Sequence, residues 1–149
     1  MALMAIVLYK EVDEKLDLGR VLKMIIVHDL GEVYTGDYQK YGKPTPENKH
    51  ALEELALGKL LSTVPSYSKQ EIIELWNEFE ECITTEAKFA VALDKLEVLI
   101  QHNEADISTY LEGEGEYNLT YADDKVEYNE ILKQFRALIK EETKDKIGN

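Results

Sequence analysis

Apolar residues recur along most of the chain at the three- and four-residue spacing of an amphipathic helix. The spacing is clearest in two segments, from about residue 18 to 31 and from about residue 86 to 103. Asp17 is a suitable N-cap for the first helix, and Thr84 or Thr85 for the second. In the first helix apolar residues cover most of the circumference, so we expect it to be central. No segment alternates with the two-residue period of a strand.

Four further helices complete the prediction. Thr45 and Pro46 form an N-cap followed by proline, and Ser68 to Glu71 form a capping box. The other helices are residues 1–12, which lack a start signal, and about 125–143; residues 33–44 and the acidic, glycine-containing stretch 112–124 are expected to be loops. The sequence therefore predicts an all-α fold, a single domain over residues 1–149 with about six helices of uneven length.

The composition excludes some partners. The formal charge is −13, from 17 basic and 30 acidic residues, and such a surface repels nucleic-acid polymers and anionic membranes. A small anionic substrate stays possible if the site supplies positive charge, for example as a metal ion. Cys82 is the single cysteine, which is typical of a cytoplasmic protein. The apolar run 2–9 has no basic leader and is too short for a membrane span.

The segment MIIVHDLGEVYTGD, residues 24–37, carries the first candidate chemistry. On a helix, His28 and Glu32 share a face, as do Asp29 and Glu32. Apolar residues one turn earlier predict largely apolar surroundings for His28 and Asp29. A carboxylate there costs several kcal/mol, on the order of the desolvation of an ion, unless a cation or hydrogen bonds compensate it.

A second acid, Asp94, interrupts the apolar run of the helix 86–103. If the two helices pack together, His28, Asp29 and Asp94 converge. An imidazole with carboxylate oxygens suits a borderline divalent metal such as Mn, Co, Fe, Ni or Zn. The alternative is purely structural: His28 donates to a backbone carbonyl, and Asp94 pairs with a lysine from another helix. In the following loop, Tyr34, Tyr38 and Tyr41 are candidates for stacking on a base, with packing against the domain as the alternative.

Two motifs resemble a known family. HDLGEVYTGD, residues 28–37, resembles the central motif of HD-domain metal-dependent phosphohydrolases. LWNEFEECITTEAKFAVALDKLEVLIQ, residues 75–101, resembles the later motif of their 5'-deoxynucleotidase branch. The resemblance covers most of residues 3–101. It implies an all-helical fold, a divalent metal, a homodimer and the hydrolysis of (deoxy)nucleoside 5'-monophosphates.

The resemblance also implies roles for individual residues. His28 and Asp29 match the paired metal ligands of the family, and Asp94 matches its late aspartate. Glu32 matches the residue expected to orient or deprotonate the attacking water. Asp37 matches a second acidic position, expected near the sugar or the leaving oxygen.

One family feature is missing. The first metal-binding histidine of the family lies in the preceding helix, and no histidine precedes His28 here. Residues 1–11 resemble the continuation of that helix, so we expect the domain to be N-terminally truncated relative to the family. The alternative is a non-catalytic or degenerate helical domain with an incomplete metal site. His50 and His102 are expected to be surface residues rather than replacement ligands.

Overall fold

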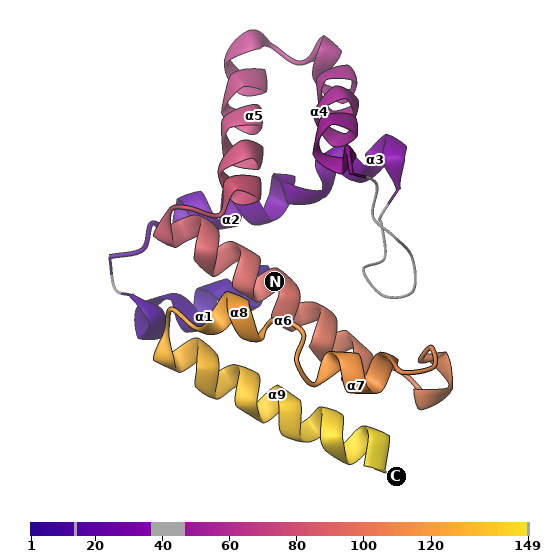
Figure 1. The fold of residues 1–149 in the computed structure, drawn as a ribbon. Helices are drawn as coiled ribbons and strands as arrows, with labels where there is room; N and C mark the ends of the chain where they lie inside the picture. Colours follow the sequence, from indigo (N-terminus) through magenta and orange to yellow (C-terminus); the bar gives the residue numbers. More distant parts are fainter. Residues whose placement is uncertain (14, 37–46, 149) are drawn as a thin grey trace.

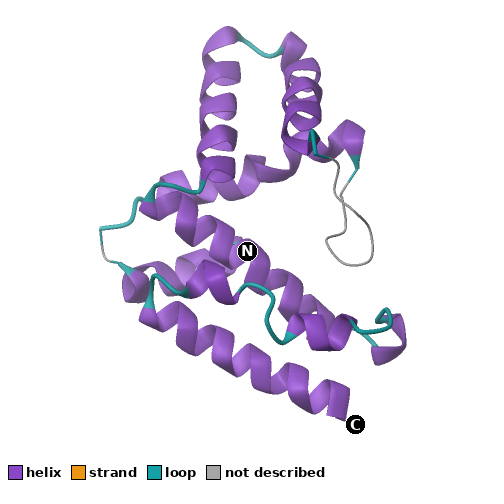
Figure 2. Cartoon of the chain, in the orientation of Figure 1, coloured by secondary structure: helices purple, strands orange, loops and turns teal. Residues whose placement is uncertain are grey.

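The computed structural model describes residues 1–13, 15–36 and 47–148, which contain helices and turns but no strand (Figures 1 and 2). The prediction of an all-α fold is therefore confirmed. In chain order the elements are α1 (Ala2–Val12), α2 (Leu18–Val27), η1 (His28–Gly31), α3 (Glu32–Thr35), α4 (Lys49–Leu60), η2 (Leu61–Thr63), α5 (Ser66–Glu81), α6 (Thr85–Glu104), η3 (Ile107–Thr109), α7 (Glu114–Asn118), α8 (Asp123–Val126) and α9 (Glu130–Gly148).

The centre of the described structure is α6. Leu93, Leu96 and Leu99 have no exposed surface, and α1, α2, α5, α8 and α9 all pack against this helix. In Figure 1, α6 crosses the middle of the molecule and α9 runs beside it. Thr84 caps its start by accepting a hydrogen bond from the Ala87 N–H at 3.1 Å, as predicted.

The helix expected to be central, α2, is only partly buried. Asp17 caps it as predicted, accepting a hydrogen bond from the Arg20 N–H at 3.0 Å. Its buried side packs against α5 and α6, whereas Ile26 is 75% exposed. The apolar residues of α2 therefore extend beyond the face that its neighbours cover.

The helices α4 and α5 run side by side as a hairpin above α2 (Figure 1). The predicted capping box at Ser68 is wrong, because α5 begins at Ser66. The Lys69 N–H donates to the Pro65 carbonyl at 2.9 Å, so the first helical turn closes directly after the proline. At its other end, Cys82 adopts a left-handed conformation with φ 52° and ends the helix.

Short helices occur where loops were expected. Residues 33–35 belong to α3, and the segment 112–124 contains all of α7 and the start of α8. A five-residue helix such as α7 is too short to show a helical period, so the pattern cannot reveal it. The predicted helix start at Thr45–Pro46 lies outside the described residues, and α9 begins at Glu130, later than expected. No described helix is both long and apolar enough to cross a membrane.

Candidate metal centre

His28 lies where α2 tightens into η1. Its Nδ1 is 2.8 Å from the Ile25 carbonyl oxygen, which can only accept a hydrogen bond, so Nδ1 is the donor. The second ring nitrogen, Nε2, lies 3.1 Å from Oδ1 of Asp29 and 3.6 Å from Oδ1 of Asp94. The structure therefore brings together the three side chains that the sequence proposed as metal ligands. The carbonyl contact that the structural alternative predicted is also present.

Two carboxylates make the space beside Nε2 favourable for a cation. Burial disfavours protonation of His28, but the hydrogen bond with Asp94 and the charge of Asp29 outweigh it and raise the pKa of the imidazole. Burial also disfavours ionised Asp94, yet the hydrogen bond from His28 and the charge of Lys95 outweigh it and lower the pKa of that carboxyl. Asp94 thus pairs with its neighbour on α6, Lys95, instead of with a lysine from another helix.

Glu32 lies beside this cluster, at the start of α3. Its Oε1 accepts a hydrogen bond from Nζ of Lys49 at 3.2 Å, and the same ammonium lies 3.0 Å from Oε1 of the buried Glu53. Burial lowers the pKa of Lys49, but Glu53 and Glu32 outweigh that effect and raise it. The close approach of η1 to α4 requires glycine at position 31, because a Cβ on Gly31 would lie 2.8 Å from the Cβ of Glu53.

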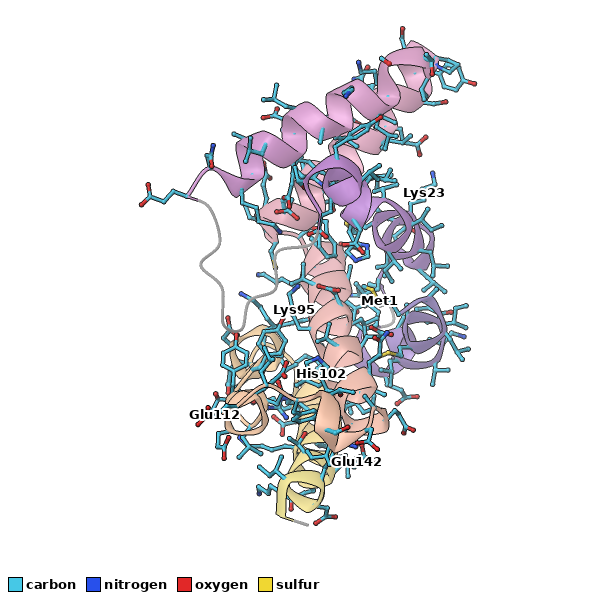
Figure 3. All side chains as sticks on the ribbon, turned by 90° about the vertical axis from the view of Figure 1, so that its right-hand side faces the viewer. Met1, Lys23, Lys95, His102, Glu112 and Glu142 are labelled. Atoms are coloured by element: carbon cyan, nitrogen blue, oxygen red, sulfur yellow. The ribbon has the colours of Figure 1, made fainter. Side chains whose placement is uncertain are left out.

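A cavity of about 670 Å³ lies at this place, a volume within the usual range for small-molecule sites. One part of its wall, which we call the His28 end, consists of His28, Asp29, Glu32, Lys49 and Asp94. The remaining wall comes from Met1, from one face of α6 and from residues 109–121. In Figure 3, Lys95 and His102 lie one above the other along α6, with the segment carrying Glu112 beside His102.

Several predicted residues lie elsewhere. Asp37, Tyr38 and Tyr41 lie outside the described residues. Tyr34 is 54% exposed and stacks under the ammonium of Lys59, which lies 4.4 Å from the ring centroid.

His50 packs on Trp76 with ring centroids 5.1 Å apart, so it is not a replacement ligand at the His28 end. His102 is partly exposed, with a side chain 33% accessible, and it lies in the cavity wall away from the His28 end.

Two parts of the cavity were not predicted from the sequence. Lys49 had a detectable signal, since it lies four residues before Glu53 on a predicted helix, the spacing of an ion pair. The stretch 112–124 was expected to be a loop, but it lines the cavity, and Tyr117 and Tyr121 within it and Tyr110 just before it contribute to the wall. No local pattern marks those tyrosines, because they lie in and around the short helix α7, which tertiary contacts such as those with α9 hold in place.

The donors at the His28 end fit a divalent ion. An imidazole whose Nδ1 donates to a carbonyl presents Nε2 in the tautomer that binds metals, and two carboxylates face that nitrogen. Across residues 1–13, 15–36 and 47–148, however, no group of three or more His, Cys, Asp or Glu side chains is already arranged to hold a metal ion. The donor atoms are of the types that bind a divalent ion. In this structure they contact one another in pairs, His28 with Asp29 and His28 with Asp94.

Comparison with known proteins gives consistent relatives. A family model described as "HD domain" matches residues 1–136. The chain is 38% identical over 88 residues to "5'-deoxynucleotidase HDDC2" of Dictyostelium discoideum, covering 59% of this chain and 46% of that protein. It is 35% identical over 104 residues to the Homo sapiens protein of the same name, covering 70% of this chain and 50% of that protein. The chain thus spans about half the length of the curated relatives it matches.

A solved structure is similar over a greater length. The crystal structure described as a predicted metal-dependent phosphohydrolase from Magnetospirillum magnetotacticum MS-1 matches with a TM-score of 0.75 and 27% identity. The match covers 99% of this chain and 75% of that one.

Proposed function

Because this chain belongs to the HD domain family, we propose that it is a metal-dependent phosphohydrolase that removes the phosphate from (deoxy)nucleoside 5'-monophosphates. The observation that carries the proposal is the convergence of Asp29 and Asp94 on Nε2 of His28 at the wall of a cavity. Support for the substrate comes from relatives named 5'-deoxynucleotidase, and support for the metal from a neighbour described as metal-dependent.

We assign the metal to His28, Asp29 and Asp94. The two carboxylates offset the charge of a divalent ion, and the hydrogen bond from Nδ1 to Ile25 fixes the imidazole so that Nε2 can bind it. When bound, such an ion supplies charge neutralisation for the phosphate and lowers the pKa of a water molecule. Mn, Co, Fe, Ni and Zn all suit this combination of nitrogen and oxygen donors.

Glu32 and Lys49 are the groups that handle the water and the phosphate. Glu32 is held at the cavity wall by Lys49, so its carboxylate is positioned to orient a water molecule and to accept its proton. The water oxygen bonds to phosphorus as Glu32 takes a proton from it, and the bond from phosphorus to the nucleoside 5'-oxygen breaks. The leaving oxygen takes a proton from solvent, and Glu32 returns its proton to solvent. The ammonium groups of Lys49 and Lys95 line the same cavity and attract phosphate oxygens. Asp37 is proposed, on the family resemblance, to contact the sugar or the leaving oxygen.

The test is phosphate release from dAMP and dTMP in the presence of Mn²⁺ or Co²⁺. We expect release that EDTA abolishes and that falls to background in the double variant His28→Ala, Asp29→Ala. Glu104→Gln, an exposed acid at the end of α6, serves as the matched control and should keep full activity. Release that is equal in the double variant and the control would contradict the proposal.

The alternative is a non-catalytic HD-fold domain with an incomplete metal site. It predicts no release from any nucleotide and no change in stability on adding EDTA. The relatives named 5'-deoxynucleotidase do not favour it.

Three properties accompany the proposal. We propose a single HD-like domain over residues 1–149, supported by the packing of both α1 and α9 against α6. We propose a homodimer, supported by Leu3, Ile6 and Val7, which share a face of α1 and are 74%, 51% and 65% exposed. Light scattering on the wild type and on Val7→Lys tests that surface, since the charged variant should be monomeric. A cytoplasmic location stays a prediction from the single cysteine.

A further inference from the structure

The cavity continues from the His28 end along α6. Asp94, Val98 and His102 line it from one face of this helix, at the spacing of successive turns. His102 follows Asp94 by eight residues, which is about 12 Å at the rise of an α-helix. That length is comparable to a nucleoside monophosphate, from its phosphate to the far edge of its base.

Aromatic rings form the wall beside this stretch of α6. We call Tyr110, Tyr117 and Tyr121 the tyrosine wall. The rings of Tyr117 and Tyr121 are in contact, with centroids 5.4 Å apart, and the ring of Tyr110 lies 5.8 Å from that of His102. Aromatic faces of this kind are the usual platform on which a nucleobase stacks.

The wall is held rigidly by α9. Arg136 is only 3% exposed; its Nη2 donates to the Asn118 carbonyl at 2.9 Å, and its Nε donates to the Tyr121 carbonyl at 3.1 Å. A Cβ on Gly115 would lie 2.6 Å from Cγ2 of Ile147, so α7 packs closely on α9. The backbone that carries the tyrosines is therefore preorganised, which reduces the entropy lost when a ligand binds.

Polar groups in this part of the cavity suit a base better than a second phosphate. Glu97 and Glu114 line it, and Nε2 of His102 lies 4.0 Å from Oε1 of Glu114. These carboxylates repel a further anion. The Tyr110 hydroxyl is buried beside the side-chain amide of Asn118, and burial raises the pKa of this phenol although the hydrogen bond with Asn118 opposes it.

We propose that the tyrosine wall, together with His102, binds the nucleobase of the substrate. The inference rests on the proposed function for the position of the phosphate at the His28 end. The base site itself does not depend on hydrolysis, because a nucleoside without phosphate contains the group that this wall recognises.

The direct test is the binding of 2'-deoxyadenosine to the metal-free protein, measured by calorimetry and by saturation-transfer NMR. We expect Tyr117→Ala to weaken binding by about 10-fold, the usual scale for loss of one stacking partner. Tyr117→Phe keeps the ring and should bind within about 2-fold of the wild type. Tyr67→Ala, which removes a tyrosine that is 78% exposed on α5, is the matched control and should bind as the wild type does.

Kinetics separate this inference from the proposed function. If the chain hydrolyses phosphomonoesters, Tyr117→Ala should raise KM for dAMP about 10-fold more than KM for p-nitrophenyl phosphate, which has no base. Hydrolysis of dAMP without any nucleoside binding, or nucleoside binding equal in Tyr117→Ala and Tyr67→Ala, would overturn the base site and leave the hydrolase standing. Nucleoside binding that depends on Tyr117 in a protein without hydrolysis would support the base site and overturn only the proposed function.

Discussion

Two histidines line the same cavity, but the structure prepares them for different chemistry. At His28, Nδ1 donates to a carbonyl, so Nε2 is the nitrogen that faces Asp29 and Asp94 and that can bind a metal once its proton is released. At His102, Nδ1 lies 3.0 Å from the Asn118 Nδ2 amide, which can only donate, so Nε2 carries the proton toward Glu114. The tautomer that binds a metal is thus fixed at one histidine and excluded at the other. A histidine in a cavity wall becomes a candidate ligand through its hydrogen-bond partner, and its exposure alone does not decide this.

The largest effect is expected from a single substitution at the His28 end. Asp94→Asn removes the charge that faces Nε2 of His28, so metal-dependent phosphate release from dAMP should fall at least about 100-fold, or about 2.7 kcal/mol in transition-state stabilisation. Steady-state kinetics with Mn²⁺ measure this, with Glu104→Gln on the same helix as the control. The binding of deoxyadenosine should persist, because the tyrosine wall is unchanged. A variant that keeps near-wild-type release would contradict the assignment of Asp94.

A smaller effect is expected from a substitution that disturbs the tyrosine wall. Arg136→Leu leaves the carbonyls of Asn118 and Tyr121 without their buried donor, so the free energy of unfolding should fall by about 1–3 kcal/mol. Urea unfolding measures the loss, and amide exchange should rise across residues 114–126. Lys140→Leu is the matched control. Arg136 and Lys140 both form an ion pair with Asp123, but the side chain of Lys140 is far more exposed than that of Arg136. Unchanged exchange in that segment would show that Arg136 does not hold the wall.

The smallest effect is expected at the ion pair between Arg20 on α2 and Glu78 on α5. The hydrogen bond from Arg20 is the main reason that the pKa of Glu78 lies below its usual value. A lowered carboxyl pKa contributes stability above the unfolded pKa, and this contribution is lost as pH falls through the folded pKa. Glu78→Gln should therefore reduce stability by about 0.2–1 kcal/mol at neutral pH and make no difference in acid.

Urea unfolding at the two pH values checks this dependence. Glu71→Gln offers a matched control, because Glu71 pairs with Lys23 across the same two helices but both side chains are more than half exposed. Its effect should be the smaller of the two. A loss for Glu78→Gln that is the same at both pH values would contradict the proposed origin of the effect.

The two sides of the cavity also differ in how well the sequence predicts them. Asp94 could be recognised because it interrupts a long apolar run, and the bounds of α6 were predicted to within a residue or two. In a long helix with a buried face, the helical spacing of the apolar residues shows which positions are buried. His28 and Asp29 were recognised by the same reasoning, and their meeting with Asp94 required only that two strongly apolar helices pack together.

No such spacing in the sequence predicts the tyrosine wall. Tyr117 lies in an acidic, glycine-containing stretch that reads as solvated, and α7 is held by contacts from far along the chain. The side-chain amide of Asn118 donates a hydrogen bond to His102, and its backbone carbonyl accepts one from Arg136. Gly115 is packed against Ile147. Tertiary contacts of this kind place short elements, so sequence periodicity could predict the His28 end and the core but could not predict the wall.

The central claim is that the His28 end binds a divalent metal and the His102 side of the cavity does not. Titration with Mn²⁺, followed by calorimetry or by the EPR signal of free Mn²⁺, tests it in three proteins: the wild type, His28→Gln and His102→Gln. We expect His28→Gln to weaken Mn²⁺ binding by at least about 10- to 100-fold, while His102→Gln binds as the wild type does. Equal affinities in the two variants, or an absence of Mn²⁺ binding to the wild type, would contradict it.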